Sequence, residues 1–209
     1  CPFNCAYLMN EAVKKAKGDY LLFLNNDTEV ITPDFLEQMV GYASQPHIGM
    51  VGVKLLFFDN TIQQGCVILG IRSMAAHAYE FQTEQEAFSF GKLNMPTDYA
   101  AVTAACSMIS KEKYNLVKGM DEHLANNFND VELNIRLLKK GFYNVYLGNV
   151  KMYHYESKTR GTDKTKAQIK RTNEEREYVL DKWHDIVFDD PFYNPCFSKN
   201  EPYVLEKKQ

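Results

Sequence analysis

The sequence has no long hydrophobic run and no pair of cysteines at metal-binding spacing. No stretch approaches ~18 consecutive apolar residues, so we expect no membrane-spanning helix. The cysteines are odd in number and include no C-x-x-C pair, which argues against a disulfide framework or a sulfur-bound metal. We expect buried thiols scattered through the fold and a reducing compartment. The five cysteines are Cys1, Cys5, Cys66, Cys106 and Cys196.

An excess of charge of one sign is also missing. The chain has 24 Lys plus Arg and 27 Asp plus Glu, a net charge of -3, so we expect no nucleic-acid partner. What the sequence does contain is apolar: 45% of its 209 residues are hydrophobic and 13% are aromatic. This composition argues against disorder and suffices for one domain with a full core.

The most informative stretch is an apolar run that ends abruptly in polar residues. Tyr20–Leu24 has no polar break, which is typical of a strand buried on both faces, as in a parallel sheet covered by helices. Residues 25–29, Asn-Asn-Asp-Thr-Glu, then fall at the carboxyl end of that strand, where open α/β sheets bind ligands. The oxygens of Asp27 and Glu29 suit Mg²⁺ or Mn²⁺. The alternative is a polar turn, because Asn and Asp form turns for local reasons.

Helical and strand patterns alternate along the rest of the chain, which predicts an α/β fold with a mixed sheet flanked by helices. Residues 70–96 show no clear period and are expected to be irregular. Helices are expected at 4–17, from Thr32 to 43, in a short segment capped by Ser110, at 129–140 and at 163–183. Strands are expected at 20–24, 48–58, 61–69, 100–109, 142–147 and 150–156.

The helix expected at 129–140 separates its acidic residues. At ~100° per residue, one narrow apolar stripe is buried, made of Val131, Ile135 and Leu138. Glu132 precedes Arg136 by four residues, the favourable order for a surface pair, so we expect Glu132 to face solvent. Asp130 falls on the far side of the helix, in its first turn, and is expected to be less solvated and unpaired.

Several ordered motifs resemble the family 2 glycosyltransferases of the GT-A fold, with the bacterial rhamnosyltransferase-like branch the most similar. The likeness covers nearly the whole chain, and the motifs together are more specific than any one of them. They are GDYLLFLNND at 18–27, VTAAC at 102–106 with GMDE at 119–122, NDVELxxRLxxxG at 129–141, HYESxxRG at 154–161 and DPFYNP at 190–195.

The resemblance implies a donor and metal site. The D-x-D motif of the family falls on residues 25–27, so Asp27 would bind Mg²⁺ or Mn²⁺ on the donor diphosphate. Asn25 replaces the first Asp and contributes no charge, and Asn25 and Asn26 would contact the donor. His154 stands where a late His of the family completes the metal shell. Arg160 or Lys158, in the loop that follows, would add positive charge, and Arg160 would contact the donor.

The resemblance also implies the chemistry. Asp130 matches the catalytic base of the family, although Asn129 departs from the Glu that usually precedes it. The implied activity is metal-dependent, inverting transfer of a hexose or deoxyhexose from a nucleotide sugar to a hydroxyl of a glycan or lipid-linked acceptor, in bacterial cell-surface polysaccharide synthesis. Acceptor-binding residues are not assigned. We expect a cytoplasmic location, including peripheral association with the inner face of the cell membrane.

A second function is left open by the two substitutions in the motifs. Asn25 and Asn129 stand where the family has acids, and they favour a catalytically inactive, GT-A-like glycan-binding or scaffolding module. The chain begins at the helix before the D-x-D strand, so we expect a partial GT-A domain that lacks its N-terminal nucleotide-binding portion. Residues 1–161 would form the metal and acceptor part, and residues 162–209 a C-terminal helix and extended tail packed on it.

Overall fold

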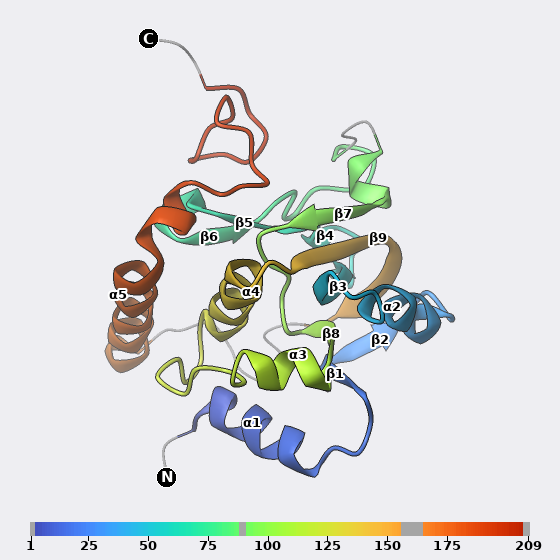
Figure 1. Ribbon diagram of the computed structural model, residues 1–209. Coiled ribbons are helices and arrows are strands. Elements are labelled where there is room, and N and C mark those ends of the chain that lie inside the picture. The colour runs from blue at the N-terminus through green and yellow to red at the C-terminus, as the bar shows by residue number, and fades with distance from the viewer. Residues whose placement is uncertain (1–2, 88–90, 156–164, 207–209) are drawn as a thin grey trace.

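A computed structural model describes residues 3–87, 91–155 and 165–206. It has a mixed seven-stranded sheet flanked by helices, with a long helix near the C-terminus, which confirms the expected fold class (Figure 1). The central path of the sheet runs β1 (Tyr20–Leu24), β8 (Cys106–Ser110), β3 (Ile48–Leu56), β9 (Tyr143–His154) and β2 (Thr28–Val30). Outside that path, β4 (Ile62–Gln64) pairs with β3 and β7 (Pro96–Tyr99) pairs with β9.

The strand β3 forms the middle of the core, and all nine of its residues are buried. Its side chains alternate between two hydrophobic clusters because successive residues of a strand point to opposite faces. Val51 and Val53 pack with residues of α2 (Phe35–Ala43), whereas Met50 packs with residues of α4 (Asn129–Lys139). The two helices therefore cover opposite faces, and α5 (Lys166–Phe188) packs outside α4 (Figure 1).

The expectation that Tyr20–Leu24 is buried on both faces is wrong. Leu21 and Phe23 are buried, but Tyr20 and Leu24 are 36% and 43% exposed. The strand lies at one end of the path and pairs antiparallel with β8. An apolar run of five residues cannot by itself distinguish a central parallel strand from an edge strand whose outward residues are also apolar.

Local contacts explain where the N-terminal helices begin. Asn4 caps α1 (Cys5–Lys15) by accepting a hydrogen bond from the backbone N–H of Tyr7. The predicted helix start at Thr32 is wrong, because its hydroxyl oxygen accepts a hydrogen bond from Lys151 N (2.9 Å) in β9, and α2 begins at Phe35. Ser110 caps α3 (Lys111–Leu116), as predicted, by accepting from Lys113 N.

The middle of the chain is more structured, and the following strand shorter, than the pattern predicts. Within residues 70–96 lie η1 (Ile71–Ser73), β6 (Ala75–His77) and η2 (Lys92–Asn94), and β6 pairs with β5 (Val67–Leu69). The strand predicted at residues 100–109 is confirmed only from Cys106 onward, where β8 (Cys106–Ser110) begins. The preceding backbone bonds instead to two buried asparagines, Asn134 and Asn144.

The prediction that Glu132 faces solvent is wrong. Its pairing with Arg136 is confirmed, at 2.7 Å, but the side chain is fully buried. It also accepts hydrogen bonds from Lys182 Nζ (2.9 Å) and Trp183 Nε1 (3.2 Å) of α5. Helical periodicity places Glu132 away from the apolar stripe, but it cannot show that another charged helix packs over that face.

The tail after α5 packs against the rest of the molecule. Asp190 is buried and accepts a hydrogen bond from Leu69 N (2.8 Å) of β5. Tyr203 stacks on Tyr79 with ring centroids 5.0 Å apart and shares a hydrogen bond with Tyr99 (3.1 Å). The boundary predicted at residue 161 lies outside the described residues.

The burial of the cysteines agrees only partly with the expectation from the sequence. The four described cysteines form no disulfide with one another, and Cys66 and Cys106 are buried, although Cys196 is exposed. Burial raises the pKa of the Cys66 and Cys106 thiols to about 12.

In the parts of the chain that the structure describes, no helix is both long and apolar enough to cross a membrane.

Candidate active site

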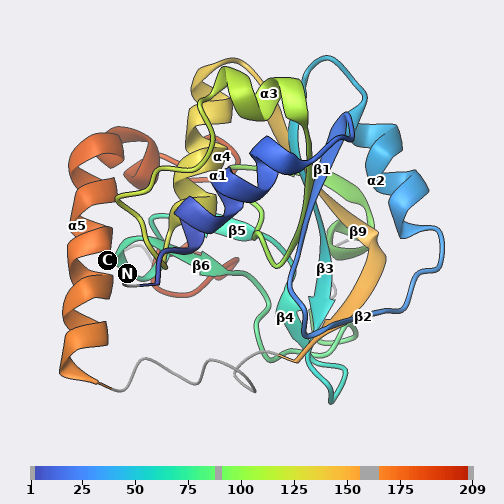
Figure 2. The ribbon, with the colours of Figure 1, turned by 90° about the horizontal axis from the view of Figure 1, so that it is seen from below.

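Strand pairing brings the two ends of the candidate metal site together. The chain leaves β1 at Leu24, turns through residues 25–27 and enters β2, where Thr28 pairs with His154, the last residue of β9. The carbonyl oxygen of Asp27 accepts a hydrogen bond from Tyr155 N (2.8 Å). Figure 2 shows β2 beside the end of β9. Residues about 125 positions apart in the sequence therefore share one edge of the sheet.

The imidazole of His154 is nearly buried and contacts three polar side chains. Its Nε2 lies 3.2 Å from Asp27 Oδ1 and 3.0 Å from Asn25 Nδ2. Its Nδ1 lies 2.6 Å from Oε1 of Gln63, a buried residue of β4. The amide nitrogen of Gln63 donates to the His154 carbonyl (3.2 Å). Sequence reasoning missed Gln63, since only the tertiary pairing of β4 with β3 carries it to the end of β9.

These contacts determine which ring nitrogen of His154 carries the proton. The side-chain nitrogen of Gln63 donates to the backbone carbonyl of His154, so the side-chain oxygen of Gln63 is the atom that faces Nδ1. Because that oxygen can only accept, Nδ1 must be the protonated nitrogen. The lone pair of Nε2 then faces Asn25 and Asp27. Two electron-rich atoms, Nε2 and Asp27 Oδ1, lie 3.2 Å apart. A proton or a cation between them removes the repulsion.

The residues fit a divalent cation that is shared with substrate. A carboxylate and a neutral imidazole are ligands that Mn²⁺ and Mg²⁺ accept, with waters and phosphate oxygens in the remaining positions. Within residues 3–87, 91–155 and 165–206, no group of three His, Cys, Asp or Glu could hold a metal by itself. The carboxylate of Glu29 accepts a hydrogen bond from the Tyr155 hydroxyl, whereas the side chains that lie at Nε2 of His154 are Asp27 and Asn25.

Asp130 lies in the first turn of α4, and the prediction that it is unpaired is wrong. Its Oδ2 accepts hydrogen bonds from Thr103 Oγ1 (3.0 Å) and Ala104 N (3.1 Å), and its Oδ1 accepts one from Val131 N (2.8 Å). A carboxylate oxygen has two lone-pair sites, so Oδ1 keeps one for a further donor. The neighbouring Ala105 carbonyl accepts from Asn25 N (2.9 Å), which links Asp130 to the turn that carries Asp27.

Two buried asparagines that the sequence analysis did not select position residues 100–104. Asn134 Nδ2 donates to the carbonyls of Val102 (3.2 Å) and Asp130 (2.7 Å). Asn144 Nδ2 donates to the carbonyls of Ala100 (2.9 Å) and Asn134 (3.1 Å). They tie the irregular backbone before β8 to α4 and β9, so the donors to Asp130 are held in place. Arg160, a predicted donor contact, lies outside the described residues.

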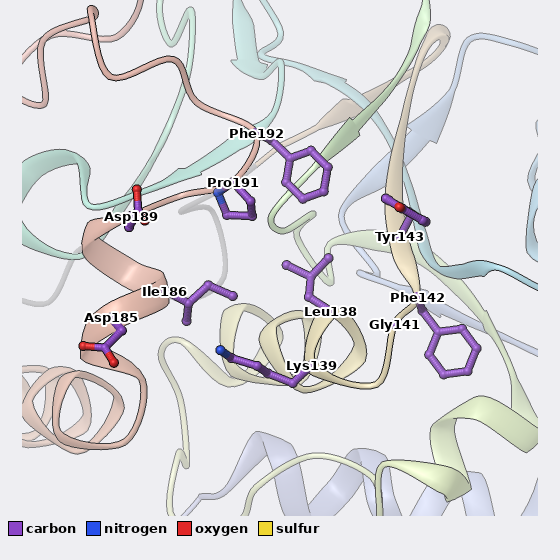
Figure 3. Close-up of a pocket in the computed structure, with 10 residues that line it drawn as sticks. All are labelled: Leu138, Lys139, Gly141, Phe142, Tyr143, Asp185, Ile186, Asp189, Pro191 and Phe192. Atoms are coloured by element: carbon purple, nitrogen blue, oxygen red, sulfur yellow. The ribbon is translucent and has the colours of Figure 1, made fainter.

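A separate hollow lies at the opposite end of β9. It has a volume of about 450 Å³, and Tyr143, the first residue of β9, is among its lining residues, whereas His154 is the last. Figure 3 shows Leu138, Ile186 and Phe192 turned toward this space. It contains none of the site residues predicted from the sequence.

The fold is that of the GT-A glycosyltransferases. A solved structure titled as GalNAc-T7 with UDP, GalNAc and Mn²⁺ superposes with a TM-score of 0.63, covering 87% of this chain and 35% of that chain at 14% identity. The family model described as glycosyltransferase like family 2 matches residues 6–177. The chain therefore belongs to glycosyltransferase family 2.

Two relatives among curated proteins are bacterial. The chain is 36% identical over 206 residues to protein y4gI of Sinorhizobium fredii, which carries the description uncharacterized, and this covers 98% of the chain and 23% of the relative. It is 34% identical over 195 residues to the O-antigen biosynthesis protein RfbC of Myxococcus xanthus, covering 93% of the chain and 15% of the relative. The chain thus spans less than a quarter of either relative.

Proposed function

We propose that this chain is the metal-binding and acceptor part of an inverting glycosyltransferase that uses a nucleotide-sugar donor. The observation that carries the proposal is the contact between Asp27 and His154, in which a carboxylate oxygen and an imidazole lone pair face each other at the end of the sheet. Asp27 and His154 would hold Mg²⁺ or Mn²⁺, and Asn25 and Asn26 would contact the donor. The chemistry that such a cation supplies is neutralisation of the charge that grows on a departing diphosphate.

Asp130 is proposed as the general base. The acceptor hydroxyl attacks the anomeric carbon from the side opposite the diphosphate, its proton passes to Asp130 Oδ1, and the bond to the diphosphate breaks with its electron pair. Three donors orient the carboxylate, and Oδ1 retains a lone pair for the incoming proton. One backside displacement inverts the anomeric configuration. Arg160, from the following segment, is proposed to contact the donor.

The acceptor is proposed to be a glycan or a lipid-linked glycan of a bacterial cell-surface polysaccharide. The name of the Myxococcus relative, O-antigen biosynthesis protein, supports this class of product. The resemblance of residues 102–106 and 119–122 to the rhamnosyltransferase-like branch supports a hexose or deoxyhexose donor. The proposed location is the cytoplasm, including the inner face of the cell membrane.

The test is release of nucleoside diphosphate from a panel of UDP-, GDP- and dTDP-sugars with Mn²⁺. We expect release with at least one donor from a longer protein that also contains the nucleotide-binding portion, and Asp130→Asn in that protein should lower it by about 10² to 10⁴, the range for loss of a general base. Asp34→Asn, at an exposed residue that contacts Gln38, serves as the matched control. Wild-type release by Asp130→Asn would refute the assignment of the base. No release with any donor would favour the glycan-binding module.

A further inference from the structure

Phe57 and Phe81 stack on each other at the end of β3, and Phe58 follows Phe57 in the chain. Phe58 and Phe81 are 75% and 68% exposed, although both are large apolar side chains. Phe57 stacks on Phe81 with ring centroids 5.2 Å apart and planes 2° from parallel. We call Phe57, Phe58 and Phe81 the aromatic platform. Contiguous exposed apolar surface on a soluble fold marks a contact with another molecule more often than isolated apolar residues do.

The backbone holds the aromatic platform in place without help from the rings. Phe57 N donates to the Thr61 carbonyl (2.8 Å), and Phe81 N donates to the Ile62 carbonyl (2.8 Å). Phe81 has a φ of 66°, a left-handed conformation that is unfavourable for a residue with a side chain and persists where the surroundings impose it. Farther along the same segment, Glu84 is held by Lys151 (2.7 Å) and by the buried Lys54.

The aromatic platform lies at the same end of the sheet as the candidate metal site. Strands β3 and β9 are parallel, and Leu56 pairs with Tyr153, so Phe57 emerges beside His154. The turn after Phe58 is bound to β9 through the Tyr153 hydroxyl, which donates to Asn60 Oδ1 (2.6 Å). Figure 2 shows this turn near the start of β2.

The charge around the aromatic platform favours a neutral, hydroxyl-rich ligand. Residues 57–64 and 79–87 contain no Lys or Arg and four acids. Glu80 and Glu84 are paired with cations, which leaves Asp59 and Glu86 as surface anions. Anionic lipid surfaces attract clusters of Lys and Arg, so this surface does not suit them. A sugar ring presents C–H groups to the negative face of an aromatic ring and hydroxyl donors to nearby carboxylates.

We propose that the aromatic platform is a stacking surface for a neutral acceptor glycan, which it presents to the site formed by Asp27, Asp130 and His154. This inference rests on the proposed function, because the ligand is the acceptor of that reaction. It assigns acceptor-binding residues on the turn after β3 and on the segment around Phe81.

The test is binding to an array of neutral oligosaccharides and purified bacterial surface polysaccharides. Wild-type protein should bind at least one glycan, and the double substitution Phe58→Ala and Phe81→Ala should weaken binding about tenfold for each ring, as loss of an aromatic contact does. Phe3→Ala removes a ring of the same type that is 60% exposed on the N-terminal segment, and it should bind as wild type. Phe58→Ala alone serves as a second variant that cannot disturb the core.

Two further measurements separate the possible failures. The affinity for Mn²⁺ should be the same in both platform variants as in the wild type. If the wild-type protein does not bind Mn²⁺, the proposed function is contradicted, whatever the result for the aromatic platform. Retained glycan binding in the double variant, or no glycan binding by the wild type, overturns the inference. Capture of wild-type protein, but not the double variant, by vesicles of equal phosphatidylglycerol and phosphatidylcholine would identify a membrane surface instead and would also overturn it.

Discussion

At the scale of single residues, the candidate site shows what motifs can and cannot identify. Asp27, Asp130 and His154 were selected from sequence motifs, and the structure places Asp27 and His154 in contact, with Asp130 linked to them through the backbone of Ala105. Gln63 could not be selected, because its role depends on a hydrogen bond to a residue 91 positions away. Motifs identify side chains that react, but their supporting contacts arise from packing.

Substitution of Gln63 tests whether it orients His154. Gln63→Leu removes the acceptor of the Nδ1 proton, so Mn²⁺ affinity should fall by about 10- to 100-fold, as for other residues that support metal ligands. The adjacent Gln64 is also buried, and its amide has no hydrogen-bond partner among the described residues. Gln64→Leu should therefore leave Mn²⁺ affinity unchanged. If the two variants have the same affinity for Mn²⁺, the hydrogen bond to Gln63 does not orient His154 for metal binding.

At the scale of elements, the sequence predicted most helices and strands but not what covers them. The helix at 129–140 was expected, and α4 is found there, but the burial of Glu132 follows from α5, which packs over the charged face. The apolar run of β1 did not reveal that it pairs antiparallel with β8. In each case the periodicity of one segment is local, whereas burial is decided by a second segment far away in the chain.

The buried pair between α4 and α5 should matter more to stability than a similar exposed pair. Glu132→Ala leaves Arg136 and Lys182 without their buried partner, which should lower the free energy of unfolding by about 3 kcal/mol. Glu174→Ala removes an i, i+4 contact with Lys170 at 3.6 Å between exposed side chains, worth about 0.5 kcal/mol or less. Urea unfolding of both variants gives the comparison. If both substitutions lower the free energy of unfolding by the same amount, the contact of Glu132 with α5 does not stabilise the fold more than an exposed pair does.

At the scale of the whole molecule, polar contacts join distant segments around a mixed sheet. Asp121, in the connection between α3 and α4, accepts hydrogen bonds from Tyr178 (2.8 Å) and Lys182 (3.0 Å) of α5. Burial acts to raise the pKa of the Asp121 carboxyl, but hydrogen bonds from His123, Lys182 and Tyr178 outweigh burial and hold it well below its usual range. The ionised carboxylate therefore stabilises the folded state.

This lowered pKa predicts how stability depends on pH. A depressed pKa in the folded state contributes stability above the unfolded value of about 3.9, and the contribution is lost as pH falls below it. Asp121→Asn should therefore be less stable than wild type at pH 7, and the gap should narrow below about pH 4. Thermal unfolding across pH measures it, with Asp185→Asn at a fully exposed position as the control. A gap that stays constant from pH 7 to pH 3 would contradict the role of the ionised carboxylate.

The proposed function depends most directly on a cation shared by Asp27 and His154. Electron paramagnetic resonance of Mn²⁺, titrated with the protein in the presence and absence of UDP, measures that binding. We expect wild-type binding that UDP strengthens, a loss of at least about tenfold in Asp27→Asn and in His154→Ala, and wild-type affinity in the control Asp34→Asn. Mn²⁺ binding of wild-type strength in both Asp27→Asn and His154→Ala would contradict the metal site.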